Sequence, residues 1–169
     1  MVTDNLDGTW SWTFDSSDGP DDSQTVTITA TDGDGDVSTT SFTLTVANLA
    51  PTIAADNATV SANVGDVASN SGSFSDPGAD TVTLTASVGT VTDNLDGTWS
   101  WDFDTTGQAT GVQTITITAT DSDNDRSSVS FDLDTNSVPT VSADSPTVTV
   151  DEGQTATNLS KMVDSYVAS

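Results

Sequence analysis

Short runs in which polar and apolar residues alternate fill most of this chain. In one of them, the large apolar residues Trp99, Trp101 and Phe103 alternate with the polar residues Thr98, Ser100 and Asp102. A period of two places every second side chain on the same face of an extended strand. Clusters of Gly, Asp, Asn and Pro separate the runs, and no segment has the 3.6-residue period of a helix. The pattern predicts an all-β chain.

The stretch from residue 49 to 137 is expected to hold seven strands. The first is split into Thr52–Ala55 and Thr59–Ala62, the second is Val67–Ser75, and the third runs on from Val82 toward the turn at Asp93–Gly97. The side chains expected to face the core are Trp99, Trp101, Phe103, Ile115, Ile117, Ala119, Val129, Phe131 and Leu133. Strands that are half polar, rich in Thr and Ser, are typical of two antiparallel sheets packed face to face.

The sequence repeats itself at an offset of 89 residues. Val2–Asp15 recurs as Val91–Asp104 and is identical at 13 of 14 positions. After a one-residue deletion, Ala50 aligns with Val138. A repeat of this length sets the fold unit.

The repeat divides the chain into three parts. We expect the C-terminal part of a first repeat at 1–48, a complete repeat at 49–137, and the N-terminal part of a third repeat at 138–169. After Asn158 the tail departs from the repeated sequence. Pro51 and Pro139 fix the backbone of the two linkers, so stiff junctions between repeats are expected.

The charge of the chain excludes several classes of partner. Its 26 acidic residues face only Arg126 and Lys161, which gives a formal net charge of -24. A phosphate backbone or an anionic membrane surface needs basic residues, so neither nucleic acid nor such a membrane is an expected partner. The sequence has no apolar run long enough for membrane insertion, and an export signal would have to lie outside these residues.

Catalytic chemistry has little support in the composition. The chain has neither Cys nor His, so it lacks the usual catalytic triads and soft-metal sites. A pair of carboxyl groups can hydrolyse glycosides, but one of them must be buried so that its pKa rises. Every Asp here falls in a turn or on a polar strand face, so we expect that this protein is not an enzyme.

The residues resemble a known family. "WDFD" at Trp101–Asp104, "QTITITATDSDND" and "SVSFDLD" resemble the PKD-type variant of the immunoglobulin-like sandwich. "VANLAPTI" and the segment from Gly72 to Trp101 are similar to PKD-like and cadherin-like tandem repeats of giant bacterial surface proteins, although "DTTG" at Asp104–Gly107 replaces part of the PKD "FGDG". The resemblance implies an immunoglobulin-like seven-stranded antiparallel β-sandwich.

The resemblance also implies a place and a role. It implies an extracellular, cell-surface array of neighbouring repeats that extends, spaces or adheres, with calcium at loops or junctions. A surface protein or a glycan would then be the adhesive partner.

Two acidic loops are the first candidates for a metal site. "DGDGD" and "DSDND" place carboxylates at every second position, and Ca²⁺ takes six to eight oxygen ligands. The candidate calcium ligands are Asp32, Asp34, Asp36, Asp121, Asp123 and Asp125. The alternative is a solvated hairpin turn in which Asp and Gly supply only the backbone geometry.

Acidic residues near the linkers form a second candidate metal site. Asp76 and Asp80 are predicted to lie in one loop and could join a junction site with Asp56. Ordinary turn chemistry explains the same residues without an ion.

Two other functions remain open, one suggested by the tryptophans and one by the divided repeats. Exposed Trp pairs can stack on sugar rings, as in a carbohydrate-binding module, but their phase with Phe14 and Phe103 favours a buried core. A strand-exchange assembly module is also possible, because front strands after Val138 could be completed by back strands before Asn48 of another chain.

Overall fold

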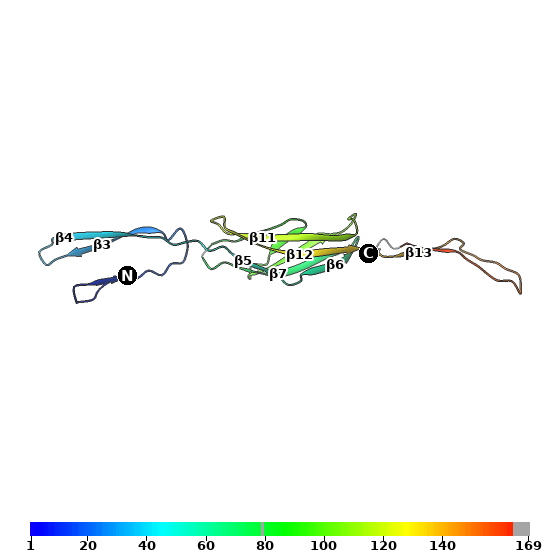
Figure 1. The fold of residues 1–169 in the computed structure, drawn as a ribbon, viewed down its shortest axis with the longest axis horizontal. Helices are drawn as coiled ribbons and strands as arrows, with labels where there is room; N and C mark the ends of the chain where they lie inside the picture. The colour runs from blue at the N-terminus through cyan, green and yellow to red at the C-terminus, as the bar shows by residue number, and fades with distance from the viewer. Residues whose placement is uncertain (79, 164–169) are drawn as a thin grey trace. The chain divides into compact units, whose positions relative to one another are not determined.

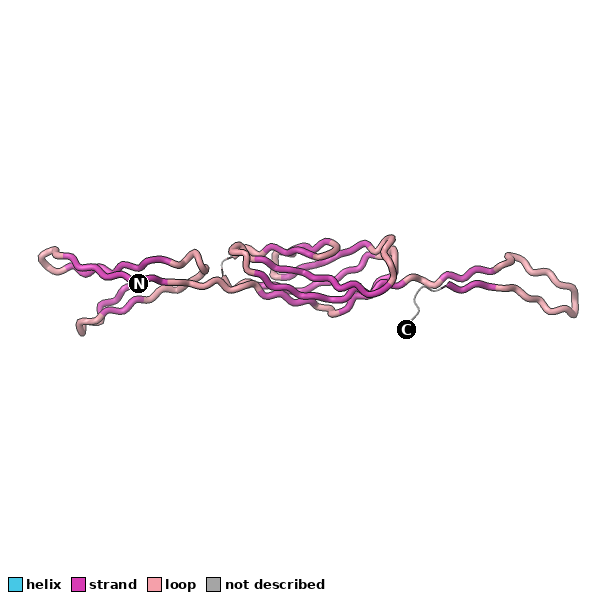
Figure 2. Tube along the Cα trace, turned by 45° about the horizontal axis from the view of Figure 1, so that its top comes forward, coloured by secondary structure: helices cyan, strands magenta, loops and turns pink. Residues whose placement is uncertain are grey.

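The computed structural model describes residues 1–78 and 80–163 (Figure 1). All regular structure in that part of the chain is β-strand (Figure 2), which confirms the all-β prediction. No helix there is long and apolar enough to cross a membrane.

Two hairpins form the N-terminal part. Strand β1 (Val2–Asp4) pairs with β2 (Trp10–Trp12), and β3 (Gln24–Thr31) pairs with β4 (Val37–Leu44), both antiparallel. The Asp and Gly residues between the paired strands supply the turns, as the sequence predicted.

The central part contains two four-stranded sheets. The first has the order β5 (Thr52–Ala55), β7 (Val67–Ser75), β10 (Thr98–Asp104), β9 (Thr90–Asp93). The second has the order β6 (Thr59–Asn63), β12 (Arg126–Asn136), β11 (Gly111–Thr120), β8 (Thr83–Ala86). With β5 and β6 taken as one split strand, this is the strand order of an immunoglobulin-like sandwich, as predicted.

The core lies between the two sheets. Trp99 and Trp101 of β10 are fully buried, as are Ile115 and Ile117 of β11. Trp101 meets Phe131 of β12 edge to face, with 5.0 Å between ring centroids. Large rings from one sheet therefore pack on aliphatic and aromatic side chains of the other, and the predicted core is confirmed at these positions.

The predicted third strand is wrong in its extent. Its residues form two short strands, β8 and β9, which belong to different sheets. Between them Gly89 has a φ of 78°, and the Trp101 indole Nε1 donates a hydrogen bond of 2.7 Å to the Val88 carbonyl. A Cβ on Gly89 would lie 2.6 Å from Trp101 Nε1, so this sheet change requires glycine.

One strand pair departs from the expected antiparallel pattern. Strand β6 runs parallel to β12, from the pair Thr59 and Asp132 to the pair Asn63 and Asn136. The break between β5 and β6 carries the first strand across to the other sheet, where it runs in the same direction as the last strand.

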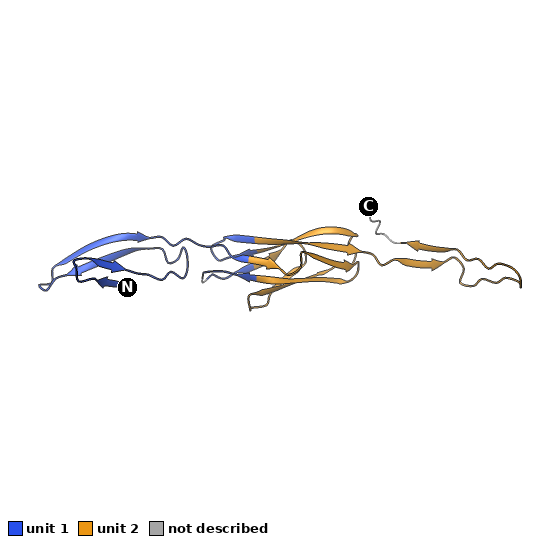
Figure 3. Ribbon diagram, turned by 60° about the horizontal axis from the view of Figure 1, so that its bottom comes forward, with its two compact units in different colours: residues 1–52, 74–83, 119–127 blue, residues 53–73, 84–118, 128–169 orange. Residues whose placement is uncertain are grey.

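At the C-terminal side, β13 (Thr140–Ala143) pairs antiparallel with β14 (Ser160–Val163). The chain divides into two compact units, coloured in Figure 3. Among the described residues, the first consists of 1–52, 74–83 and 119–127, and the second of 53–73, 84–118 and 128–163. The repeat boundaries expected at 48 and 137 stay predictions.

Candidate functional site

Three carboxyl groups from three different loops converge within the first unit. One oxygen each from Asp18, Asp80 and Asp123 lies within 4.8 Å of the other two. The loops that carry them follow β2, β7 and β11 respectively. Within residues 1–78 and 80–163, these three acids form the group whose spacing would suit one shared cation.

Several oxygens of this acidic cluster lack a hydrogen-bond partner. Oδ1 of Asp18, Oδ2 of Asp80 and Oδ2 of the neighbouring Asp76 are shielded from solvent and accept no hydrogen bond from any described residue. Shielded carboxylate oxygens are normally satisfied, because leaving them unpaired costs free energy. The cluster therefore carries acceptor capacity that the described residues, 1–78 and 80–163, do not use.

Glycine allows the acids to approach one another. The Gly78 backbone N–H donates to Asp76 Oδ1 at 2.9 Å. A Cβ at this position would lie 3.1 Å from Asp80 Oδ2 and 3.3 Å from Asp76 Oδ1, closer than most side chains tolerate. The "DPG" sequence thus places two carboxylates on one side of a tight turn.

Burial and the neighbouring negative charges raise the pKa of two carboxyl groups in the cluster. Partial burial, followed by the negative charges of Asp80, Asp21, Asp22 and Asp76, raises the pKa of Asp18 above its ordinary value. The pKa of Asp123 is raised in the same way, by burial and then by the charges of its neighbours, with Asp80 the strongest. A bound cation would favour the charged forms that this arrangement now disfavours.

The three aspartates of the predicted calcium loop at residues 121–125 do not all point to one site. Asp121 is 4% exposed, and its Oδ1 accepts the backbone N–H of Asp125 at 2.8 Å. The Asn48 side-chain amide donates to Asp121 Oδ2 at 2.9 Å and to Asp125 Oδ2 at 3.1 Å. Asp121 and Asp125 are therefore engaged by an amide, and of the three predicted ligands only Asp123 joins the acidic cluster.

The neighbouring Ser122 ties this loop to the cluster. Its hydroxyl donates a short hydrogen bond to Asp80 Oδ1. Asp80 thus accepts this hydrogen bond on one oxygen, while its other oxygen accepts none from the part of the chain that the structure describes.

The first predicted calcium loop has the geometry of a hairpin turn. Asp32 Oδ1 accepts the backbone N–H groups of Asp34 at 3.1 Å and Asp36 at 2.9 Å. All three residues are exposed, and their carboxylates do not form a group of three in the described chain. Calcium binding by this loop stays a prediction.

Sequence reasoning missed Asp18, although the repeat contains a signal for it. The loop "DSSDGPDD" after β2 aligns with "DTTGQATG" after β10. Asp18 thereby corresponds to Gly107, and Asp22 corresponds to Gly111. The two copies of the repeat therefore differ in charge at these positions. Asp80 was predicted at a junction with Asp56, but the Asp56 carboxylate instead accepts the hydroxyl of Ser71 at 2.5 Å.

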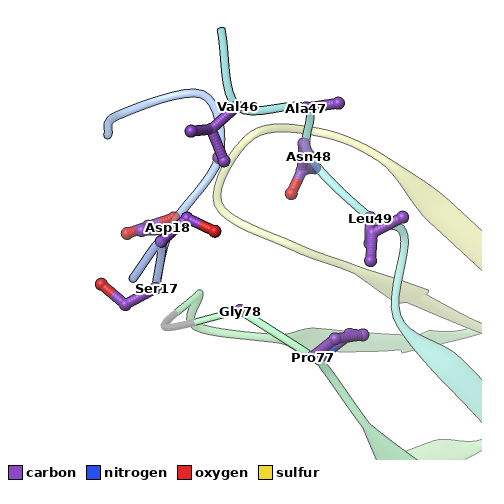
Figure 4. A pocket seen from close by; sticks show the side chains of 10 residues that line it. Ser17, Asp18, Val46, Ala47, Asn48, Leu49, Pro77 and Gly78 are labelled. Carbon is purple, nitrogen blue, oxygen red and sulfur yellow. The ribbon is translucent and has the colours of Figure 1, made fainter. Parts of the chain in front are cut away.

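A hollow next to the cluster is lined by residues of the first unit (Figure 4). Asp18, Asn48, Leu49, Pro77 and Gly78 contribute to its walls. Asp18 is the one ionisable group among its lining residues.

Fold and loops together define a chain of immunoglobulin-like sandwich repeats with acidic loops. No family model matches its sequence, and no curated protein matches it. Among solved structures, it is similar to titin Ig tandem domains A164-A165, with 12% sequence identity and a TM-score of 0.40. The match covers 70% of this chain and 64% of that chain, so it spans less than two thirds of the titin structure.

Proposed function

We propose that this chain is a non-catalytic structural spacer, built of tandem repeats, in a large secreted or cell-surface protein. The repeated sandwich with its Thr- and Ser-rich outer strand faces supports this role. Its neighbours would be further repeats of the same protein, and any adhesive target would be a surface protein or a glycan. Full burial of Trp99 and Trp101 speaks against a sugar-stacking platform on the complete repeat.

We further propose that the acidic cluster binds Ca²⁺. The observation that carries this proposal is the convergence of Asp18, Asp80 and Asp123, whose oxygens lie within 4.8 Å of one another. Ca²⁺ accepts oxygen ligands in flexible geometry, and water can complete its coordination. Bound Ca²⁺ would join three loops that otherwise repel each other, and so would stiffen the first unit.

Thermal unfolding in calcium and in chelator tests this proposal. Extracellular calcium modules bind with dissociation constants on the order of 10⁻⁴ M. At about 100 times that concentration, Ca²⁺ should stabilise the folded protein by roughly 2.7 kcal/mol. Asp80→Asn should abolish most of this calcium-dependent rise in Tm and, because it removes repulsion, should raise Tm in chelator.

Asp34→Asn is the matched control, because Asp34 lies in the exposed turn between β3 and β4. Its calcium response should equal that of the unaltered protein. Identical melting curves in calcium and chelator would remove Ca²⁺ from the proposal. Loss of the response in Asp34→Asn but not in Asp80→Asn would move the site to the β3–β4 turn.

A further inference from the structure

The complete repeat leaves half of one strand without a neighbour on one side. Strand β11 runs over 10 residues, Gly111–Thr120, whereas β8 beside it has 4, Thr83–Ala86. The backbone N–H of Ser87 donates to the Thr116 carbonyl at 2.9 Å, and the backbone N–H of Thr116 donates to Ser87 Oγ at 3.0 Å. Pairing on this side of β11 therefore ends at Thr116, and residues 111–115 continue beyond it.

The chain leaves this side of β11 because it crosses to the other sheet. After Ser87 it turns at Gly89, whose φ is 78°, and continues as β9, which pairs with β10. The Val88 carbonyl accepts the hydrogen bond from Trp101 Nε1, so the crossing point is fixed on the core. The missing half-strand is therefore a property of the complete repeat itself.

Val112 and Thr114 turn their backbone hydrogen-bonding groups toward this unpaired side. In an antiparallel pair, the N–H and C=O of one residue point to the same neighbour, and successive residues alternate. Because those of Thr116 point to Ser87, those of Thr114 and Val112 point to the same side. Both residues are exposed, Val112 by 67%. Free N–H and C=O groups are a template for a further strand, and we call Val112 and Thr114 the open edge.

A hollow lies beside the open edge, on the side of β11 that faces the core. Gln113 has the strand phase of the buried Ile115 and so faces the core side, yet it is exposed. Its neighbours around the hollow include Phe103, Gln108 and Thr135. The volume of about 240 Å³ lies below the roughly 300–1,000 Å³ of small-molecule sites, so it suits one side chain better than a whole ligand. We call it the edge hollow.

On the outer face of the sheet, a carboxylate lies one strand away from the open edge. The Thr114 hydroxyl donates to Asp132 Oδ1 at 2.8 Å, and the register of β11 with β12 that this contact belongs to places Val112 beside Asp134. Asp134 Oδ1 is shielded from solvent and has no hydrogen-bond partner among the described residues. A strand added at the open edge would lie about 10 Å from Asp134, two strand spacings, which a Lys or Arg side chain can cross.

We propose that the open edge binds an extended, basic peptide segment of another protein as an added strand. The backbone of the peptide pairs with Val112 and Thr114, one apolar side chain enters the edge hollow, and the flanking Lys or Arg side chains face Asp134. Neighbouring residues of a strand point to opposite faces, so one alternating segment meets both requirements. The formal net charge of -24 favours a basic partner in the same way.

This proposal goes beyond the spacer function, because it names a kind of partner for the side of a repeat. It uses no residue of the acidic cluster, so it is tested in chelator. Its failure would leave the spacer function and the calcium site as they stand, and their failure would leave the open edge unchanged.

Amide hydrogen exchange of the full chain, followed by NMR with a synthetic peptide, tests the proposal. The probe is an end-capped peptide of about seven residues in which Lys and Val alternate, close to the common length of a strand. The buffer contains chelator and about 0.15 M NaCl, which limits unspecific attraction. We expect slower exchange at the Val112 and Thr114 N–H groups, and no change at Gln113, whose N–H points to β12. A peptide in which Glu and Val alternate should protect neither residue.

Two pairs of variants separate strand addition from general charge attraction. Val112→Pro removes one donor of the open edge and leaves the pairing with β12 in place, so it should weaken peptide binding about ten-fold. Val112→Thr keeps that N–H and should change binding by less than about two-fold. Asp134→Asn should weaken binding about three-fold, whereas Asp34→Asn, which removes the same charge from the exposed β3–β4 turn, should leave it unchanged.

Three results would overturn the proposal. The first is no protection of Val112 and Thr114 at about 1 mM peptide, where even a weak contact is half occupied. The second is an equal loss of binding in Asp134→Asn and Asp34→Asn, which would mean that only net charge attracts the peptide. The third is protection of the same two N–H groups by rising concentration of the protein alone, which would assign the open edge to a second copy of this chain.

Discussion

At the scale of single residues, two pairs of aspartates have pKa values shifted in opposite directions. Hydrogen bonds from the Thr98 hydroxyl and backbone lower the pKa of Asp96, and the same groups of Thr106 lower that of Asp104. Partial burial and neighbouring charge raise the pKa of Asp18 and Asp123. The first group stabilises its turns when charged, whereas the second is held together against repulsion.

These opposite shifts predict opposite responses to pH. A raised pKa means that the protonated form of Asp18 favours folding, so its contribution is fully present below the ordinary value of 3.8 and is lost as pH rises through the raised pKa. In chelator, Asp18→Asn should therefore be more stable than the unaltered protein at pH 7, with a smaller difference near pH 4.

Asp96→Asn is the opposite control. The lowered pKa of Asp96 contributes stability above 3.8 that is lost as pH falls, so this variant should be less stable at pH 7. Denaturant unfolding at the two pH values measures both differences. Equal responses of the two variants would contradict the division into two groups.

The sequence predicted the buried residues better than the binding residues. Period-two alternation identified Trp99 and Trp101 as core, because burial follows from the phase of a strand. The same alternation predicted that Trp10 is buried, whereas Trp10 is 46% exposed in the structure. Asp18 was missed because loops far apart in sequence create the acidic cluster, and only its difference from Gly107 marked it.

At the scale of elements, both hairpins with the sequence "DNLDG" contain a residue in an unfavourable backbone conformation. Leu6 has a φ of 61° and Leu95 a φ of 65°, in the left-handed region. Leu95 is 89% exposed, so packing does not compensate for this conformation. Asn and Gly adopt it at lower cost.

Leu95→Asn should therefore stabilise the complete repeat by roughly 0.5–1 kcal/mol. Leu95→Ala is the matched control at the same position, because alanine keeps the Cβ that disfavours the left-handed region. Denaturant unfolding of both variants measures the difference. A gain of equal size in Leu95→Ala would show that removal of exposed apolar surface, and not backbone conformation, is the cause.

Elements defined by local sequence were predicted best. Strand β7 has the predicted bounds Val67–Ser75, because turn residues flank it on both sides. The break between β8 and β9 was missed, since the hydrogen bond from Trp101 to Val88 joins residues that are distant in sequence. The parallel pairing of β6 with β12 was missed for the same reason.

At the scale of the whole molecule, charge opposes the compact state. The formal net charge is -24, because 26 acidic residues are opposed by one Lys and one Arg. Self-repulsion of this kind destabilises folded proteins and is screened by salt. We therefore expect the net charge to lower the stability of the folded protein at low ionic strength.

Raising NaCl from about 10 mM to about 500 mM in chelator should increase Tm by roughly 2–5 °C. KCl should act equally, because screening depends on ionic strength and not on the identity of the monovalent cation. Calorimetry at matched protein concentration provides the measurement. A Tm that does not change with salt would mean that the acids are too far apart to destabilise the fold.

The parallel pairing of β6 with β12 has a mechanical consequence. Strand β6 lies near the start of the complete repeat and β12 at its end, so tension on the two ends would pull these strands in opposite directions along their length. The residue pairs from Thr59 with Asp132 to Asn63 with Asn136 would then bear the load together, in shear, and would not unzip one by one. A repeat connected in this way resists stretching more than its modest core alone would suggest.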